Sequence, residues 1–470
     1  MNHGVNPFDA DVVVIGGGIS GLAAAFGLQR RGHRVVVLEA ANRAGGVIGS
    51  IRRDGGLFET GPNSTLDTTP LINELLSALG IRDERRDASA VAATRYIVRG
   101  GRLVPLPMSP RAFLTTPAFT LRAKLRLGAE PFIARTPAGR EESIAAFVRR
   151  RLGVEFLDYA IDPFVAGIYA GDPEQISVPA AFPRLLALEQ KYGSLIKGQV
   201  KGARERKQNA ETAKNAAVSF SFRNGMQTLT DALAQRLARV ECGVQVQRVV
   251  RNEDGTWSVE AMRAGAPTLF RAHCVIVAAP AHAATAMIAD VAPQAAQALR
   301  AIEYAPIAGV ASAYRRDDVR HSLDGFGFLV PKKERRRVLG TLFSSSMFDG
   351  RAPGGTVLLT TFAGGRRNPE IAALDDDAVR AAVRDELAAL IGAGKPLWQE
   401  VVRWPQAIPQ YNLGHLERLA HVDAAEAALP GLRFCANYRG GVSVGDCVKA
   451  ADATADTLDR YLRAAVTVTA

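Results

Sequence analysis

The chain has 470 residues, 47% of them hydrophobic, and a formal net charge of +11 at neutral pH. This length exceeds one ordinary hydrophobic core and predicts two or three globular domains. Because the sequence contains no run of 18 apolar residues and no signal-peptide pattern at its start, we expect a cytoplasmic protein, neither exported nor membrane-spanning.

The four cysteines are widely spaced and form no CxxC pair. This spacing argues against a zinc site and a disulfide framework, favours a reducing compartment, and leaves no metal site expected. The basic excess gathers in runs at 149–151, 201–207 and 332–337. Such runs are typical of solvated faces, but they also suit anionic lipid headgroups or a polycarboxylate ligand, and charge alone leaves nucleic acid open.

The N-terminal segment predicts a βαβ unit, with strands at 11–15 and 34–38 around a helix at 20–31. Its turn has the spacing GxGxxG, in which glycines permit a tight turn and bring the backbone close to a pyrophosphate at the helix N-terminus. We therefore predict a dinucleotide site at Gly16, Gly17, Gly18, Ile19, Ser20 and Gly21.

Glu39 ends the second strand, where a carboxylate accepts hydrogen bonds from ribose hydroxyls; this disfavours NADP and leaves NAD and FAD. The following RAGG sequence, typical of FAD enzymes of the glutathione-reductase type, favours FAD. A polar loop with two flexible glycines would explain RAGG alone, but not the later Gly-Pro turn in FETGPNS. The predicted FAD contacts in this region are Glu39, Ala40, Arg43, Gly45, Gly46, Gly61, Pro62, Asn63 and Ser64.

From about 112 to 217 the pattern is helical, which predicts a helical insert. Its apolar positions alternate with arginines and lysines, as in an interfacial amphipathic surface, although core-facing helices give the same pattern. The stretch 200–215 is expected to form a solvated loop. The apolar positions concerned are Phe113, Phe119, Leu121, Leu125, Phe132 and Ile133.

After the insert, strands at 244–250 and 257–261 are expected to form a hairpin around EDG. Val249 is a candidate adenine contact, because we expect its strand to enter the nucleotide-binding sheet. Alternating strands between 305 and 362 predict an antiparallel substrate platform. The C-terminal sequence predicts a strand at 432–436, a glycine-rich turn and a helix from Val444 or Gly445, with Asp446 as a first-turn cap and the positive helix end toward a flavin.

Several motifs together resemble the oxygen-dependent protoporphyrinogen oxidases, flavoenzymes of late haem biosynthesis in the superfamily of FAD-dependent amine oxidases and phytoene desaturases. The resemblance covers essentially the whole chain. VVIGGGISGLAAA and EAANRAGG fit any member of the superfamily, and FRNGMQTL and GGVSVGDCV also match. The narrower similarity comes from GIYAGDPEQIS, GFGFLVP and IPQYNLGH.

The resemblance implies an α/β fold: a glutathione-reductase-type FAD-binding Rossmann domain, an antiparallel substrate-binding sheet and an α-helical, membrane-binding-like insert. The FAD-binding domain would be discontinuous, with residues 1–85, 218–292 and 420–470. The substrate-binding domain would comprise 86–111 and 293–419, and the insert 112–217.

The resemblance also implies that Arg95 pairs with a substrate propionate, that Leu329 and Phe362 clamp the macrocycle, and that Gly167 forms a tight wall beside it. Trp404 is expected to pack near the flavin. No acid or base is assigned. The remaining cofactor contacts implied are Val249, Val442, Ser443 and Val444.

The implied activity is the FAD-dependent, six-electron oxidation of protoporphyrinogen IX to protoporphyrin IX by oxygen, with release of hydrogen peroxide. The alternatives are oxidation of coproporphyrinogen III by the same fold, an amine oxidase or carotene desaturase, and a non-catalytic tetrapyrrole carrier. Nucleic acid is not an expected partner. Peripheral contact with the inner face of the cytoplasmic membrane, transfer of product to a ferrochelatase, and a homodimer are compatible with this interpretation. His415, in the LGHL sequence, is expected to be structural.

Overall fold

A computed structural model describes residues 8–107, 109–137, 139–199, 201 and 217–469. Its centre is a five-stranded parallel sheet with the order β10–β2–β1–β14–β20. β-branched side chains fill both faces of the central strands, as expected of a parallel sheet covered on both sides. The α/β class is therefore confirmed. The strands are β1 (Val12–Ile15), β2 (Val35–Glu39), β10 (Val240–Cys242), β14 (Cys274–Val277) and β20 (Leu432–Phe434).

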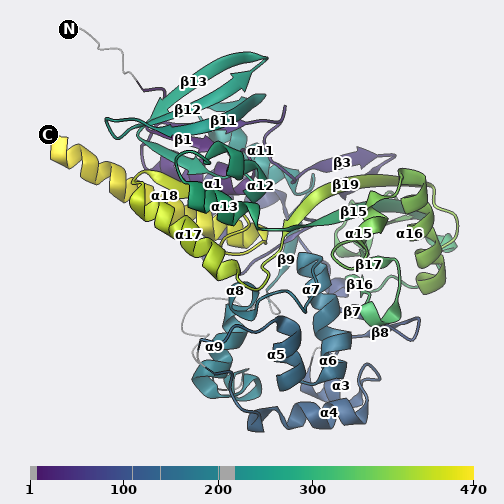
Figure 1. Cartoon of the computed structure of the whole chain (residues 1–470). Helices are drawn as coiled ribbons and strands as arrows, with labels where there is room; N and C mark the ends of the chain where they lie inside the picture. The colour runs from purple at the N-terminus through teal and green to yellow at the C-terminus, as the bar shows by residue number, and fades with distance from the viewer. Residues whose placement is uncertain (1–7, 108, 138, 200, 202–216, 470) are drawn as a thin grey trace.

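The first and last long helices pack side by side against this sheet (Figure 1). Helix α1 (Ile19–Arg30) connects β1 to β2, and α18 (Val444–Thr469) follows the C-terminal turn, both as predicted. Their close approach uses Gly27, where an added Cβ would lie 3.1 Å from Cβ of Ala455. The two ends of the described chain therefore share one core.

A three-stranded antiparallel sheet covers the other face of the parallel sheet. The predicted hairpin is confirmed as β11 (Val244–Arg251) and β12 (Trp257–Arg263), and β13 (Ala266–Ala272) adds an unpredicted third strand. The strand assignment of Val249 was wrong: its strand does not enter the parallel sheet. The preceding strand, β10, already occupies the edge beside β2, so β11 pairs with β12 instead, and Val249 lies opposite Val259.

A seven-stranded sheet lies beside the parallel sheet (Figure 1), with the order β19–β15–β18–β17–β16–β7–β8. The strands between 305 and 362 pair antiparallel, as predicted, and the sheet's one parallel pair among the described residues joins β16 to β7, which comes from outside this range. Strand β7 comes from a distant part of the sequence, so no hairpin forces the antiparallel direction. The strands are β7 (Arg95–Arg99), β8 (Arg102–Pro105), β15 (Tyr304–Arg315), β16 (Gly327–Leu329), β17 (Val338–Leu342), β18 (Thr356–Gly364) and β19 (Trp398–Pro409).

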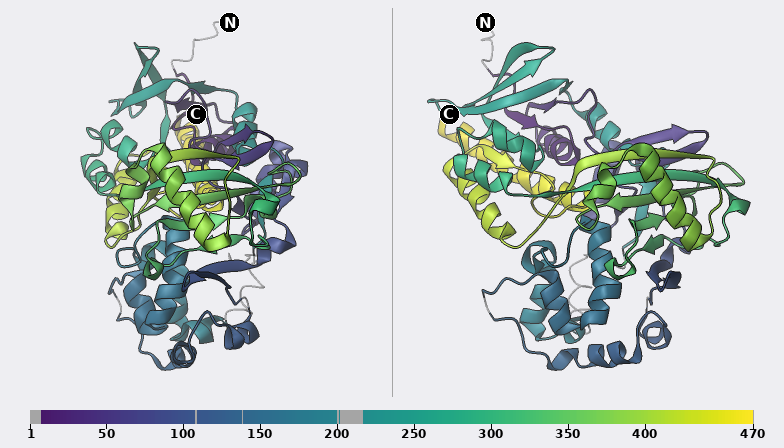
Figure 2. Two further views of the ribbon diagram at one scale, coloured as in Figure 1. Left: turned by 90° about the vertical axis from the view of Figure 1, so that its right-hand side faces the viewer. Right: turned by 45° about the vertical axis from the view of Figure 1, so that its right-hand side comes forward.

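A group of helices lies at the end of the molecule away from the three-stranded sheet (Figures 1 and 2). Phe119 is buried there, whereas Leu121, Leu125 and Phe132 are 71%, 69% and 87% exposed, so the predicted apolar positions divide between core and surface. No helix in the described ranges has the length and apolar character that a bilayer crossing requires. These helices are α3 (Pro110–Thr115), α4 (Leu121–Gly128), α5 (Ile144–Arg151), α6 (Val154–Phe156), α7 (Asp162–Tyr169), α8 (Val178–Ala181) and α9 (Pro183–Tyr192).

Shorter elements join these layers. The predicted solvated loop at 200–215 lies, apart from Lys201, outside the described residues. The shorter strands are β3 (Ser50–Arg53), β4 (Gly56–Glu59), β5 (Thr65–Leu66), β6 (Arg85–Asp87) and β9 (Ser219–Phe222). The other helices are α2 (Pro70–Leu79), α11 (Gln227–Arg236), α12 (Ala281–Met287), α13 (Pro293–Arg300), α14 (Ser344–Met347), α15 (Pro369–Ala373), α16 (Asp376–Ile391) and α17 (His415–Ala428).

Candidate functional site

The turn between β1 and α1 requires glycine for steric reasons. Gly16 has a φ of +109°, and a Cβ there would lie 3.0 Å from the carbonyl oxygen of Ala278. A Cβ at Gly21 would lie 2.0 Å from the carbonyl oxygen of Gly16. The α1 N-terminus has no side-chain cap, so its first N–H groups are available to an anionic ligand.

Glu39 is held beside this turn. Its carboxylate accepts hydrogen bonds from the main-chain N–H groups of Gly17 (2.6 Å) and Ala41 (2.8 Å). These bonds bring the end of β2, followed by Ala40, next to the glycine turn. This is the position in which a carboxylate meets a ribose in dinucleotide-binding folds.

The RAGG loop packs directly on the glycine turn. The Gly45 N–H donates to the Gly17 carbonyl oxygen (2.7 Å), and a Cβ at Gly46 would lie 3.2 Å from Cα of Gly18. The Arg43 guanidinium donates to the carbonyl oxygens of Ala44 (2.9 Å) and Ile48 (3.0 Å), so it braces its own loop.

The Gly-Pro turn at 61–64 lies against the RAGG loop. A Cβ at Gly61 would lie 2.3 Å from the Val47 carbonyl oxygen. Trp404 donates from Nε1 to the carbonyl oxygen of Thr60 (2.7 Å), directly before this turn. Within and beside the turn, Asn63 donates to the Gly61 carbonyl oxygen and Ser219 to the Ser64 hydroxyl.

The C-terminal glycine loop approaches the same place, because it leads directly into α18, which packs against α1. The hydroxyl of Ser443 accepts from the Asp446 N–H (3.2 Å) and donates to its carboxylate (2.6 Å), so Ser443 caps α18 and Asp446 lies in the first turn as its partner. Val442 and Val444 flank Ser443 at this helix start.

Tyr411 supports this loop and was not found from the sequence. Its buried hydroxyl donates to the carbonyl oxygen of Asn437 (2.7 Å) and accepts from the N–H of Gly441 (3.0 Å). Tyr411 belongs to the IPQYNLGH motif, and the similarity of this motif to known sequences could have pointed to it. The role of Tyr411, however, depends on tertiary contacts that the sequence does not show.

The seven-stranded sheet presents three predicted substrate contacts on one face. Phe362 lies opposite Gly309 on one side and Gly340 on the other, and Gly340 lies opposite Leu329. Directly opposed residues of neighbouring strands point to the same face. Neither neighbour of Phe362 has a side chain, and Leu329 packs over Gly340, where a Cβ would lie 3.2 Å from its Cδ2.

Arg95 shares that face, because it lies opposite Gly327, two residues before Leu329. Its guanidinium lies 5.3 Å from the ring centre of Phe326 and makes no hydrogen bond or ion pair with any residue that the structure describes. Burial lowers the pKa of Arg95 from its ordinary value, but an arginine stays protonated at neutral pH. This cation is available to an anionic ligand.

Helix α7 forms the opposite wall. A Cβ at Gly167 would lie 3.1 Å from Cδ2 of Leu329, and the neighbouring Ala166 packs in a cluster with Phe362 and Ile307. The structure therefore brings together Gly167, Leu329 and Phe362, with Arg95 on the same sheet face. We call these four residues the substrate slot, as the candidate place for a substrate.

Comparison with known proteins agrees with this geometry. Residues 19–458 match the family described as flavin containing amine oxidoreductase. The chain belongs to this family. It is 34% identical to protoporphyrinogen oxidase 2 of Arabidopsis thaliana, over 96% of this chain and 94% of that protein. It is 28% identical to the coproporphyrinogen III oxidase of Bacillus subtilis, over 96% and 98% of the two chains.

The fold comparison adds a solved structure from Exiguobacterium that carries a provisional protoporphyrinogen oxidase name. It has a TM-score of 0.79 and 24% identity, and the match covers 95% of this chain and 98% of that one. These matches confirm the resemblance to the porphyrinogen oxidases, the FAD cofactor and the class of FAD-dependent oxidoreductase. The glycine turn, the uncapped α1 N-terminus and Glu39 fit such a cofactor.

Two predicted residues of this flavoenzyme lie away from the slot. Val249 has a fully buried side chain in the core between two sheets, so it can reach a cofactor only through its main chain. His415 is buried, with Nε2 2.9 Å from the Tyr438 carbonyl oxygen and its ring stacked 4.3 Å from that of Tyr411. Burial lowers the pKa of His415 to about 4, so the ring is neutral at pH 7 and structural, as expected.

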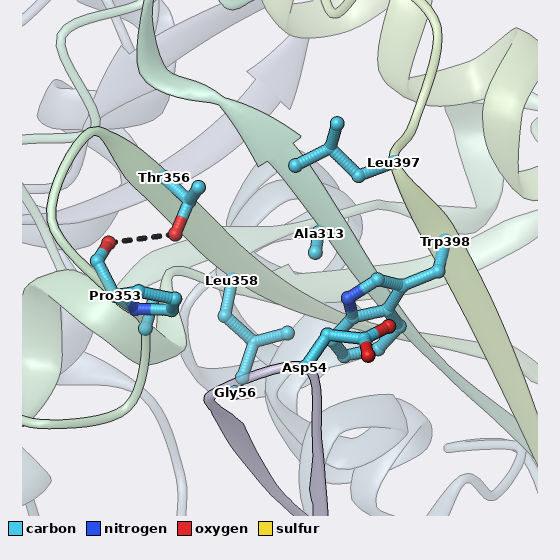
Figure 3. A pocket seen from close by; sticks show the side chains of 9 residues that line it. Asp54, Gly56, Ala313, Pro353, Thr356, Leu358, Leu397 and Trp398 are labelled. Carbon is cyan, nitrogen blue, oxygen red and sulfur yellow. Dashed lines mark hydrogen bonds between the residues drawn. The ribbon is translucent and has the colours of Figure 1, made fainter.

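A separate cavity of about 200 Å³ lies behind the hairpin of β3 and β4 (Figure 3). Its walls include Asp54, Leu358, Leu397 and Trp398. None of the residues predicted to contact FAD or substrate lines it, so it is distinct from the slot of the flavoenzyme.

Proposed function

We propose that this flavoenzyme oxidises a porphyrinogen, with protoporphyrinogen IX as the preferred substrate, to the corresponding porphyrin in haem biosynthesis. The observation that carries the proposal is the slot itself. An unpaired arginine, a leucine and a phenylalanine flanked by glycines share one sheet face, and Gly167 lies against that leucine. Such a surface suits a wide apolar ring with a carboxylate at its edge.

The binding energy would come mainly from the apolar walls. Burying about 400 Å² of ring surface at ~25 cal/mol/Å² gives roughly 10 kcal/mol, much of which association costs offset. A charge-assisted bond from Arg95 adds about 1.5–3 kcal/mol. The walls would therefore supply affinity, while Arg95 would fix the orientation of the ring.

When bound, FAD would supply the redox chemistry, which for a six-electron oxidation amounts to three two-electron cycles with oxygen as the final acceptor. The protein residues then have the task of holding the substrate at a near-attack distance of about 3–3.5 Å. This task fits the predicted contacts, which are one arginine, two large apolar residues and one glycine.

We propose that different segments of the sequence bind the cofactor and the substrate. The FAD-binding part would comprise residues 1–85, 218–292 and 420–470. The α1 N–H groups would face the diphosphate, Glu39 the ribose, and the main chain of Val249 the adenine. The 442–444 loop and the RAGG and Gly-Pro turns would lie at the flavin side. Residues 86–111 and 293–419 would hold the substrate. The segment 112–217 would form the helical insert.

The charges near the slot favour protoporphyrinogen over the four-carboxylate coproporphyrinogen. Arg99, four residues beyond Arg95, is already paired with Glu155 (2.8 Å). Lys332 and Lys333, just after β16, are paired with Asp172 and Asp158. Arg95 is thus a free cation beside cations that are already neutralised, which suits a substrate with fewer carboxylates.

The exposed apolar residues of the insert suggest a peripheral membrane contact. Leu114, Leu121, Leu125 and Phe132 are each at least 69% exposed on neighbouring helical segments, and this part of the chain is rich in basic residues. A contact with the inner face of the cytoplasmic membrane would follow. Transfer of product to a ferrochelatase and a homodimer stay expectations to which no surface is assigned.

Flavin bleaching under nitrogen tests the proposal. We expect protoporphyrinogen to bleach the flavin absorption faster than coproporphyrinogen, and porphyrin fluorescence with hydrogen peroxide to appear in air. Faster bleaching by coproporphyrinogen would support the alternative substrate. Porphyrin binding without bleaching by either compound would instead support a carrier, and bleaching by amines alone would support an amine oxidase.

A further inference from the structure

The walls of the substrate slot come from separate elements whose spacing no local segment fixes. Gly167 belongs to α7, whereas Leu329 and Phe362 belong to β16 and β18. The gap between Gly167 and Leu329 must therefore be set by contacts that join α7 to the sheet.

A buried ion pair makes that connection. Arg367 pairs with Asp162, the first residue of α7, at 2.8 Å, and the two side chains are only 5% and 6% exposed. The same guanidinium donates to the main-chain oxygens of Asp162 (2.8 Å) and Val330 (2.6 Å). Asp162 also accepts from the N–H of Lys332 (2.8 Å). One arginine thus joins the start of α7 to the residue that follows Leu329.

The other end of α7 is fixed by the same segment. The N–H of Arg366 donates to the carbonyl oxygen of Ala170 (2.7 Å), directly after the helix. A Cβ at Gly365 would lie 2.7 Å from that oxygen, so the contact is close. Residues 365–367 directly follow β18, which carries Phe362. Their contacts with α7 and with Val330 therefore connect Phe362 to Gly167 and Leu329.

We propose that Arg367 is a positioning residue of the substrate slot, which fixes the distance between Gly167 and Leu329 through Asp162 and the main chain at Val330. This inference rests on the proposed porphyrinogen oxidation. The planar guanidinium binds three oxygens at once, whereas a lysine ammonium is a flexible point charge without the fork geometry. Lysine at 367 would keep the charge beside Asp162 but loosen the wall.

The test compares Arg367→Lys with Arg403→Lys, a control with similar partners at a more exposed position. Arg403 also binds a carboxylate, that of Asp376 (2.8 Å), and a main-chain oxygen, that of Ala372 (2.6 Å), but it lies next to Trp404 and therefore on the other sheet face. We expect Arg367→Lys to raise KM for protoporphyrinogen about five- to ten-fold, with kcat and bound FAD within about two-fold of wild type. Arg403→Lys should change neither.

A double-mutant cycle separates positioning from general support. In a Leu329→Ala background, where the gap is already open, we expect Arg367→Lys to raise KM less than about two-fold. An equal KM for Arg367→Lys and Arg403→Lys, or fully additive effects with Leu329→Ala, would overturn the proposal. If Arg367→Lys does not fold, Asp162→Asn/Arg367→Met, which removes both charges, is measured in its place. If neither folds, the pair supports the fold rather than the slot, and the proposal is wrong.

Wild-type turnover is measured first, and it separates this inference from the proposed function. Absence of any porphyrinogen oxidation by the FAD-loaded wild type contradicts the proposed function. Normal wild-type turnover with an unchanged KM in Arg367→Lys contradicts only the role of Arg367.

Discussion

A Cβ at Gly167 would lie 3.1 Å from Cδ2 of Leu329, so the leucine packs closely against α7 at this glycine. Gly167→Ala would force the leucine side chain to move toward the substrate. We expect the variant to fold and to raise KM about ten-fold, since a leucine displaced into the slot takes room from the substrate and a loss of about 1.4 kcal/mol in binding corresponds to ten-fold. Steady-state kinetics with protoporphyrinogen measures this change.

Gly128→Ala is the control for this substitution, because a Cβ at that helical glycine meets no atom within 4 Å. The proposed wall is wrong if Gly167→Ala and Gly128→Ala have the same KM.

Arg95→Ala should affect substrate binding more than turnover. Loss of a charge-assisted bond of about 1.5–3 kcal/mol corresponds to a KM roughly 10- to 100-fold higher, with kcat changed only a few-fold. Arg102→Ala, an exposed position on the neighbouring strand β8, should behave as wild type. Flavin that substrate no longer reduces in Arg95→Ala, despite normal substrate affinity, would contradict this role.

Trp404→Phe should weaken FAD binding, because it removes the hydrogen bond from Nε1 to the Thr60 carbonyl oxygen beside the Gly-Pro turn. A net loss of about 1 kcal/mol predicts a dissociation constant about five-fold higher, measured by flavin fluorescence on titration of apoprotein. Trp398→Phe on the same strand lines the separate cavity and should leave FAD affinity unchanged. Equal FAD affinities of Trp404→Phe and Trp398→Phe would contradict a role of Trp404 in FAD binding.

Acid should destabilise the protein through His415. Its folded pKa is lowered to about 4 by burial, whereas the ring in the unfolded chain titrates near 6.5. Between these values the unfolded state binds the extra proton, so the free energy of unfolding falls as pH falls from about 6.5 to 4. The contribution of this group is roughly 3 kcal/mol at most.

Urea unfolding of the FAD-loaded protein at pH 7 and pH 4.5 measures this loss of stability. The free energy of unfolding of His415→Gln should depend less on pH than that of wild type. His421→Gln, on the exposed side of the same helix, should keep the wild-type dependence. A wild-type pH dependence retained in His415→Gln would assign the acid sensitivity to other groups.

The sequence predicted the parts of the site that depend on local spacing. Gly16, Gly18 and Gly21 lie within one turn, and Ser443 with Asp446 within another, so local spacing identifies these residues, although Gly16 also packs on the distant Ala278. The roles of Tyr411 and Arg367 depend on contacts with Gly441 and Asp162, far away in the sequence. No local pattern specifies such pairs.

The same limit applies to the sheet face. Gly309 and Gly340 gain a role only when strand register sets them on either side of Phe362, and register between distant strands is a tertiary property. The parallel pair of β16 and β7, and the pairing of β11 away from the parallel sheet, escaped prediction for the same reason.

The packing of α1 against α18 has a consequence for biosynthesis. A nascent chain can form the glycine turn early, but the surface that α18 completes around it becomes available only when residues beyond 444 have left the ribosome. If the loop before α18 contacts FAD as proposed, a nascent chain stalled before α18 should retain FAD less well than one in which α18 has formed.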